Sequence, residues 1–150
     1  MLGILNNEEI EKLLYEQNVG RLACYADGKL YLVPITYVYD GEYIMGHTNE
    51  GTKVSMMRKN PEVCFETDKM NDIFNWQSVI IWGLYEELKG DEATNAFKKI
   101  YERISPLMKT TKEVHPHAED KTIHKRDISL DSAIVYRIRI LEKTGRFEKR

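Results

Sequence analysis

Residues 30–47 read LYLVPITYVYDGEYIMGH, and this stretch decides the fold. β-Branched and aromatic residues dominate both of its halves, and the Asp40-Gly41 pair between them is typical of a tight turn. Asp27-Gly28 is a second turn signal of the same kind, and the residues that precede it are again mostly apolar. The pattern therefore predicts three consecutive antiparallel strands, over residues 21–25, 30–39 and 43–47.

Three more strands are expected further along the chain. Residues 63–67 and 76–86 have the composition of strands, and Gly83 inside the second run predicts a β-bulge or a bend. A last strand over residues 133–140 alternates apolar and basic residues and should close the sheet. Six antiparallel strands favour a small closed barrel over a sandwich, so the expected fold class is mainly β, a β-barrel with flanking helices.

Two short segments have the spacing and the boundary signals of helices. Asn6, followed three residues later by Glu9, is a capping box and predicts a helix over residues 7–17. A second helix is expected over residues 51–59, because the residue before Pro61 disfavours helical backbone angles.

The clearest amphipathic pattern begins at Asp91 and recurs through Ile104, which predicts a longer helix packed on the barrel. Residues 106–127 are polar and aperiodic, so we expect a long loop that stays mobile until a substrate or a second subunit orders it. His115, His117 and His124 in this loop suggest either a zinc or haem site or a polar loop that happens to hold histidines. We favour the polar loop and expect no metal, because no cysteine or carboxylate pattern accompanies the histidines.

Composition excludes several classes of function. The 150 residues include 22 basic and 24 acidic side chains, a net charge of −2 that argues against nucleic-acid binding and against a polybasic membrane anchor. No apolar run approaches the roughly 20 residues of a membrane span, and the N-terminus lacks the features of a secretory signal. Cys24 and Cys64 form no CxxC motif and are expected to be reduced thiols. We therefore expect one cytoplasmic domain over residues 1–150.

Residues 46–53, GHTNEGTK, run from a predicted strand end into a predicted helix start. Backbone N–H groups, the Thr52 hydroxyl and the Lys53 ammonium could converge there on a phosphate. The order of residues differs from a P-loop, in which lysine directly follows the glycine, so we do not expect nucleotide hydrolysis. The alternative is that Thr52 and Lys53 only begin a surface helix, and spacing does not decide between the two. His47 taken alone is more typical of a half-buried structural residue than of a catalyst.

Several motifs occur in a fixed order along the chain: Gly20-Arg21-Leu22-Ala23, residues 33–41, His47, Gly51-Thr52-Lys53, residues 60–66 and residues 76–83. In combination they resemble the pyridoxamine 5'-phosphate oxidase-like split-barrel flavoproteins, in the branch similar to nitroimidazole-resistance proteins. The resemblance covers about residues 18–88, with a weaker similarity over residues 138–145.

This resemblance implies a split β-barrel that binds FMN at the interface of a homodimer. It assigns the isoalloxazine ring to one strand and to a serine, namely Val33, Pro34, Ile35, Thr36 and Ser78. It assigns the ribityl phosphate to His47, Thr48, Thr52 and Lys53. Thr52 stands where true oxidases often carry arginine, and the C-terminal tryptophan and arginine signature of those oxidases is absent. Vitamin B6 oxidation is therefore not expected.

The function implied by the resemblance is an FMN-dependent oxidoreductase that reduces a small substrate, for example a nitroaromatic compound. The cofactor would carry the chemistry, so no catalytic dyad is expected and no catalytic residue is assigned. The alternative is a non-catalytic flavin- or haem-binding carrier or sensor. A deazaflavin in place of FMN also stays open, as do the physiological substrate and the electron donor.

Overall fold

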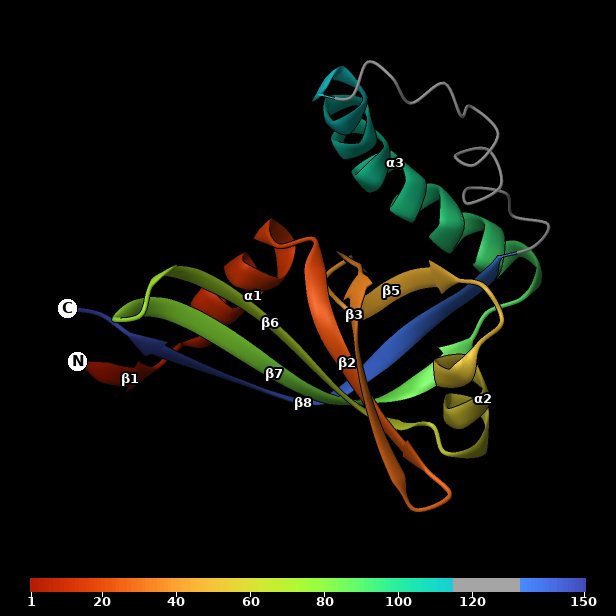
Figure 1. Cartoon of the computed structure of the whole chain (residues 1–150), viewed down its shortest axis with the longest axis horizontal. Helices are drawn as coiled ribbons and strands as arrows, with labels where there is room; N and C mark the ends of the chain where they lie inside the picture. The colour runs from red at the N-terminus through yellow and green to blue at the C-terminus, as the bar shows by residue number, and fades with distance from the viewer. Residues whose placement is uncertain (115–132) are drawn as a thin grey trace.

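The computed structural model describes residues 1–114 and 133–150, which fold into eight strands and three helices (Figure 1). The strands are β1 (Leu2–Ile4), β2 (Val19–Ala26), β3 (Lys29–Thr36), β4 (Val38–Tyr39), β5 (Tyr43–Thr48), β6 (Glu62–Asp72), β7 (Asn75–Glu87) and β8 (Ile134–Glu148). The helices are α1 (Asn7–Glu16), α2 (Thr52–Lys59) and α3 (Gly90–Val114).

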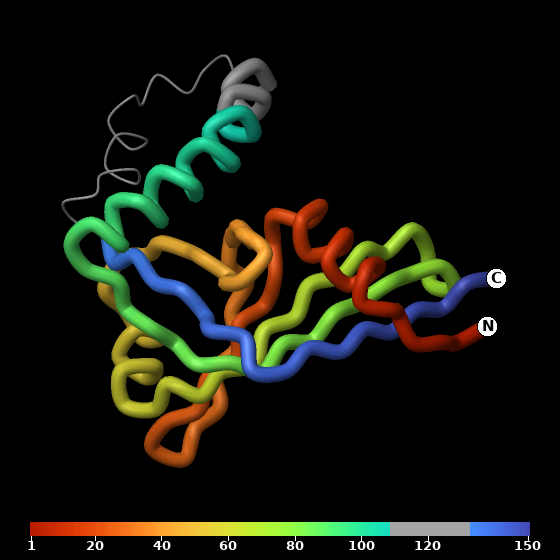
Figure 2. The backbone as a smooth tube through the Cα atoms, turned by 180° about the vertical axis from the view of Figure 1, so that it is seen from behind, coloured from red at the N-terminus to blue at the C-terminus, as the bar shows by residue number. Residues whose placement is uncertain are grey.

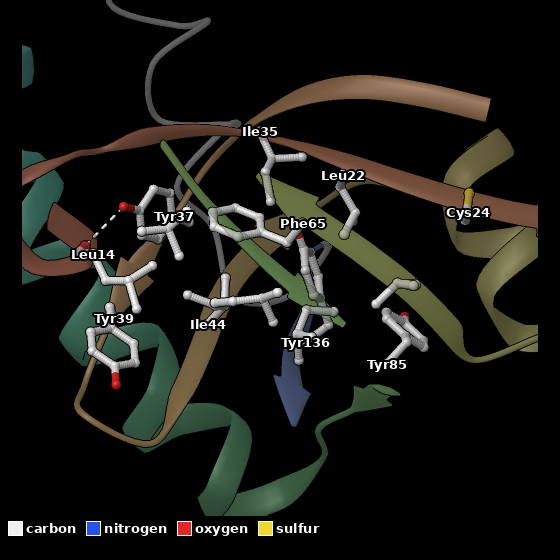
Figure 3. Close-up of a cluster of buried hydrophobic side chains, with 14 of the residues drawn as sticks. Leu14, Leu22, Cys24, Ile35, Tyr37, Tyr39, Ile44, Phe65, Tyr85 and Tyr136 are labelled. Carbon is white, nitrogen blue, oxygen red and sulfur yellow. Dashed lines mark hydrogen bonds between the residues drawn. The ribbon is translucent and has the colours of Figure 1, made fainter. Parts of the chain in front are cut away.

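All strands pair antiparallel in the order β3-β2-β6-β7-β8-β5-β4, and β1 adds to β8. The first and last strands of this order, β3 and β4, are consecutive in the chain and are separated by Tyr37 alone. The sheet therefore curls round to a barrel. Tyr37 is fully buried at this junction, where its backbone N–H donates to the Asn18 carbonyl at 2.9 Å and its phenol donates to the Leu14 carbonyl at 2.8 Å (Figure 3).

The predicted strand 30–39 is thus one extended segment that pairs with β2 in its first part and with β5 in its last part. The turn predictions at its two ends are confirmed. Asp27 and Gly28 both have positive φ, 52° and 75°, as a two-residue hairpin turn of type I′ requires. At the other end, the Asp40 carboxylate accepts the backbone N–H groups of Glu42 and Tyr43 at 2.9 and 2.7 Å.

The β-bulge predicted at Gly83 is confirmed. The pairing of β7 with β8 shifts register between Trp82 and Gly83. A Cβ atom on Gly83 would lie 2.5 Å from the Arg139 carbonyl oxygen, so the close approach of the two strands requires glycine.

The expectation of six strands is wrong, because β4 is separate and β1 was not predicted at all. The strands β6, β7 and β8 also extend beyond residues 63–67, 76–86 and 133–140. The extensions of β6 and β8, together with the first half of β7, form an arm outside the barrel that ends near both chain termini (Figure 2). Residues 69–72 of β6 and several residues of β8 beyond Ile140 are exposed and mostly polar, so these extensions lack the apolar pattern on which the prediction depended.

The capping box is confirmed, since the Asn6 side chain accepts the Glu9 N–H and the Glu9 carboxylate accepts the Asn6 N–H, both at 2.8 Å. The loop predicted over residues 106–127 is wrong for residues 106–114, because α3 continues through Pro106 to Val114. The second half of α3 projects away from the barrel (Figure 1). A helix that does not pack against a core needs no apolar face, so its sequence can be as polar as that of a loop. The rest of the predicted loop lies outside the described residues.

Two apolar clusters hold the fold together. The larger one fills the barrel, with Leu22, Ile44, Phe65 and Tyr136 all fully buried (Figure 3). The smaller one lies under α3 and contains Met45, Leu88, Ala96, Ile100 and Val135. Burying such side chains contributes about 1.5–3 kcal/mol each. Because strand residues alternate, every barrel strand has an inner face toward these clusters and an outer face toward solvent.

Candidate functional site

The start of α2 holds a lysine with an unusual environment. Lys53 donates from Nζ to Thr48 Oγ1 at 2.6 Å, which joins the first turn of α2 to the end of β5. The side chain is half-buried, and this burial lowers the pKa of the Lys53 ammonium. Among the side chains of residues 1–108 and 133–150, no carboxylate lies within ion-pair distance of Lys53. A half-buried cation whose bonded neighbour is a hydroxyl group is suited to binding an anion.

The acidic residue of this segment is held away from the lysine. Glu50 pairs with Arg58 at 2.9 Å, and the same guanidinium also binds Glu87 at 2.9 Å. The N-terminus of α2 has no side-chain cap, so its first N–H groups are available to an anion as well. Thr52 is exposed at the first position of the helix, next to Lys53. The residues present therefore fit a phosphate group.

Cys24 of β2 also belongs to this region, and sequence reasoning did not predict it. Burial raises the pKa of the Cys24 thiol, and the nearby Lys53 charge opposes that rise. Cys24 lies on the inner face of β2, directly opposite Tyr31 of β3. Alternation along the strand predicts that Cys24 points inward, but only the packing of α2 against β2 brings Lys53 to it.

His47 is not directed toward the lysine. It faces the opposite side of β5 from Thr48, and its ring makes an edge-to-face contact with Phe97 of α3 at a centroid distance of 5.8 Å. His47 and Phe97 line a small apolar cavity of about 100 Å³ beneath α3. The structure thus brings Thr48, Thr52 and Lys53 together, and it places the His47 ring elsewhere.

The predicted ring-lining strand is divided between the two faces of β3. Pro34 and Thr36 are exposed on the outer face, whereas Ile35 is buried and Val33 packs against the core. Ser78 of β7 also lies on the outer face, opposite Asp68 of β6. A ligand on the outer face could therefore reach Pro34, Thr36 and Ser78, and it could not reach Ile35.

A charged cluster separates these residues on the outer face. Arg21 NH1 lies 3.2 Å from Asp68 Oδ2 and 3.8 Å from Glu66 Oε2. Burial and the neighbouring Asp68 carboxylate raise the pKa of Glu66 to about 7, more strongly than Arg21 lowers it. Sequence reasoning did not predict this cluster. Its one signal was the spacing of Glu66 and Asp68, which are two positions apart on β6 and therefore lie on a single face.

Comparison with known proteins agrees with this architecture. A family model described as pyridoxamine 5'-phosphate oxidase matches residues 6–146. The chain belongs to this family.

Solved structures of related fold include several proteins named for flavin binding. An FAD-binding protein from Mesorhizobium loti has a TM-score of 0.78 at 26% identity, over 100% of this chain and 98% of that one. The FAD binding protein from Mycobacterium smegmatis has a TM-score of 0.64 at 22% identity, over 99% and 100% of the two chains. A proposed 5-nitroimidazole antibiotic resistance protein from Bacteroides thetaiotaomicron has a TM-score of 0.71 at 16% identity, over 98% and 87%. At such identities the last two show the fold alone, which is the split β-barrel.

An uncharacterised protein of Rhizobium meliloti is 33% identical over 85 residues, which are 57% of this chain and 56% of that protein. The chain thus spans about half the length of the curated relative it matches. The chain is a member of the family and shares the barrel of the solved structures.

The described residues contain neither a metal site nor a disulfide. Among the side chains described, those of residues 1–108 and 133–150, no three from His, Cys, Asp or Glu lie together as metal ligands would, and the two cysteines are free thiols. The predicted alternatives at His115, His117 and His124 lie outside the described residues. Among the described helices, none is long and apolar enough to cross a membrane.

Proposed function

We propose that this chain is an FMN-binding flavoprotein that works as a homodimer and transfers electrons to a small oxidised substrate such as a nitroaromatic compound. The observation that carries the proposal is the half-buried Lys53, which donates to Thr48 and has no carboxylate partner in the described residues. Membership of the oxidase family and the flavin-binding names of structural relatives support it.

In this proposal, the chain's residues have two tasks. Lys53, Thr52 and the first N–H groups of α2 bind the phosphate, and Thr48 holds the Lys53 ammonium in place by accepting its hydrogen bond. On the outer face, Pro34 and Ser78 contact the ring system. FMN itself would supply the two-electron chemistry when bound, and the protein supplies position and electrostatics.

The homodimer is proposed because the outer face of the barrel carries an exposed apolar patch next to the charged cluster, and no described residue covers this patch. Leu32 of β3, Ala23, Cys64 and Trp82 of β7 lie side by side in register across four strands. Leu32 is 67% exposed, and its neighbour Leu30 is 77% exposed. A contiguous apolar patch on a sheet face marks an interface, and a second copy of the same surface would cover it symmetrically.

The oligomeric state is tested by light scattering at micromolar concentration. We expect twice the chain mass of 17.6 kDa for the wild type and a shift to the monomer for Leu32→Glu. Ile73→Glu is the matched control, because Ile73 is 74% exposed but lies in the turn between β6 and β7, away from this patch. A wild-type mass of 17.6 kDa with flavin still bound would contradict a two-chain site.

Turnover is tested on the purified, flavin-loaded protein. We expect an absorbance spectrum of bound flavin that bleaches with a reductant and returns when a nitroaromatic acceptor is added. A bound flavin that no small acceptor reoxidises would favour a carrier or sensor, and a Soret band would favour haem.

A further inference from the structure

The cluster of Arg21, Glu66 and Asp68 lies between two residues assigned to the flavin ring. Across β3, β2 and β6, Pro34 lies opposite Arg21, and Arg21 lies opposite Glu66. Two residues after Glu66 on β6, Asp68 lies opposite Ser78 of β7. All five positions are on the outer face, and directly opposite residues on one face of a sheet have Cβ atoms about 4.5–5.5 Å apart.

The cluster holds more acidic than basic groups, because a single guanidinium, that of Arg21, lies beside two carboxyl groups. Arg21 is the cation that faces Glu66 from β2, and Asp68 and the Cys64 thiol are its neighbours on β6. From β7, only the uncharged Ile80 and Ser78 reach this part of the face. The phenol of Tyr37, on the inner side of the sheet, also interacts with the Glu66 charge. Two close carboxylates with one cation favour holding a proton between them.

We propose that the Glu66 and Asp68 pair delivers the proton that an oxidised substrate takes up when it receives a hydride from the reduced flavin, an inference that rests on the proposed function. A bound reduced flavin would supply the hydride and with it two electrons, and would itself be oxidised, so the substrate would gain one negative charge. The carboxyl O–H bond of the pair then breaks, and a new bond to hydrogen forms on the reduced substrate.

The pair recovers its proton from water. The Glu66 and Asp68 side chains are 30% and 28% exposed, so solvent reaches both carboxylates in the free chain. Arg21 stabilises the pair after it has lost the proton, because it lies near both carboxylates. The Glu66 and Asp68 pair can therefore donate a proton near neutral pH and take up another from solvent. The Arg21 guanidinium stabilises the negative charge that remains on the pair.

The first test needs no flavin. We expect carboxyl ¹³C NMR of the flavin-free chain to show one side-chain carboxyl that titrates near pH 7, and this signal should be absent from Glu66→Gln. Glu62→Gln is the matched control, because Glu62 lies on the same face of β6, is exposed and makes no ion pair within the described residues. The proposal is overturned if every carboxyl titrates below about pH 5.

The second test follows the reoxidation of the pre-reduced, FMN-loaded protein by a nitroaromatic acceptor in a stopped-flow instrument. The rate constant for the wild type and for Glu62→Gln should fall as pH rises through about 7. For Glu66→Gln it should be about a hundredfold lower at about pH 6 and nearly independent of pH, which is the lower end of the roughly 10²–10⁴-fold that a positioned general acid contributes. Identical pH profiles for wild type and Glu66→Gln overturn the proton role alone. Failure of the wild type to bind flavin overturns the proposed function, and the proton role with it, while the NMR titration is unaffected.

Discussion

The start of α2 and the outer face of β6 are electrostatic opposites. At α2, one half-buried ammonium has a threonine hydroxyl as its bonded neighbour, whereas on β6 two carboxylates share one arginine. Both groups are pushed toward their neutral forms, because the pKa of Lys53 is lowered and that of Glu66 is raised to about 7. The difference indicates what each region binds: an anion beside Lys53 and a proton between Glu66 and Asp68.

The two regions also differ in how the chain builds them. Thr48 and Lys53 are five residues apart, so the turn from β5 into α2 is enough to join them. Arg21 and Asp68 come from separate hairpins and meet only because β2 and β6 pair in one register. A shift of that register by one residue would turn every side chain of β6 to the other face, so the second region depends on the whole barrel.

The largest expected effect is on phosphate recognition. Lys53→Ala should weaken FMN binding by about 1.5–3 kcal/mol, which is about tenfold to a hundredfold, because a charge-assisted hydrogen bond is lost. Riboflavin, which has no phosphate, should be affected much less. Fluorescence quenching titrations with both flavins measure the difference.

Lys59→Ala is the matched control for this titration. Lys59 lies on the same helix, but its ammonium is exposed and pairs with Asp27 at 2.7 Å. We expect its FMN affinity to match the wild type. An equal loss for both flavins in Lys53→Ala would mean that Lys53 supports the fold or the ring, and unchanged FMN affinity would place the anion site elsewhere.

The second expected effect is on the pH dependence of stability. The pKa of Glu66 is about 7 in the folded chain and near 4.5 in the unfolded chain, so the folded state holds the proton more tightly. The free energy of unfolding should therefore fall as pH rises from about 4.5 to 7 and should not fall further above 7 on this account. Because the side chain is partly exposed, solvent screening limits the effect to about 1 kcal/mol.

Glu66→Gln removes this titration. Urea denaturation should find the variant more stable than the wild type at about pH 8 by about 1 kcal/mol, with a smaller or reversed difference at about pH 5. Glu62→Gln should follow the wild type at both values. The same stability difference at the two pH values would show that Glu66 does not titrate in this range.

The two regions were not equally predictable from sequence. The turn at residues 27–28, the bulge at Gly83 and the capping box at Asn6 depend on local backbone preferences, and all three are confirmed. The contact of Lys53 with Thr48 lies within residues 46–53, where the order of glycine, threonine and lysine alone indicates a possible anion site.

Long-range and exposed features were missed, for physical reasons. The second half of α3 is polar and holds Pro106, so in composition it resembles a loop although it is helical. β1 is three residues long, and it exists because β8 offers a free edge. The cluster around Glu66 needs the register of β2 with β6, and the contact of His47 with Phe97 needs the position of α3, neither of which residue spacing reveals.

A smaller effect is expected from the residue that orients the lysine. Thr48→Val keeps the shape of the side chain and removes the oxygen that accepts the Lys53 hydrogen bond. FMN affinity should fall by about 0.5–1 kcal/mol, roughly twofold to fivefold, because the ammonium must then be held by the phosphate alone. Isothermal titration calorimetry measures the change, and riboflavin affinity should be unaltered. A loss as large as that of Lys53→Ala would mean that Thr48 contacts the phosphate directly.

The smallest expected effect tests whether Arg21 is a structural ion pair or the counter-ion of a proton site. As a partly exposed ion pair, Arg21 should contribute about 0–1 kcal/mol to stability, so Arg21→Gln should change the urea midpoint only slightly at about pH 5. It should nevertheless raise the pKa of Glu66 above about 7, because the cation that favours the ionised carboxylate is gone. Carboxyl NMR should therefore show the Glu66 midpoint moving to higher pH while the fold stays intact. An unchanged midpoint would mean that Arg21 is too well solvated to affect the pKa of Glu66. Burial and the Asp68 carboxylate would then determine that pKa without Arg21.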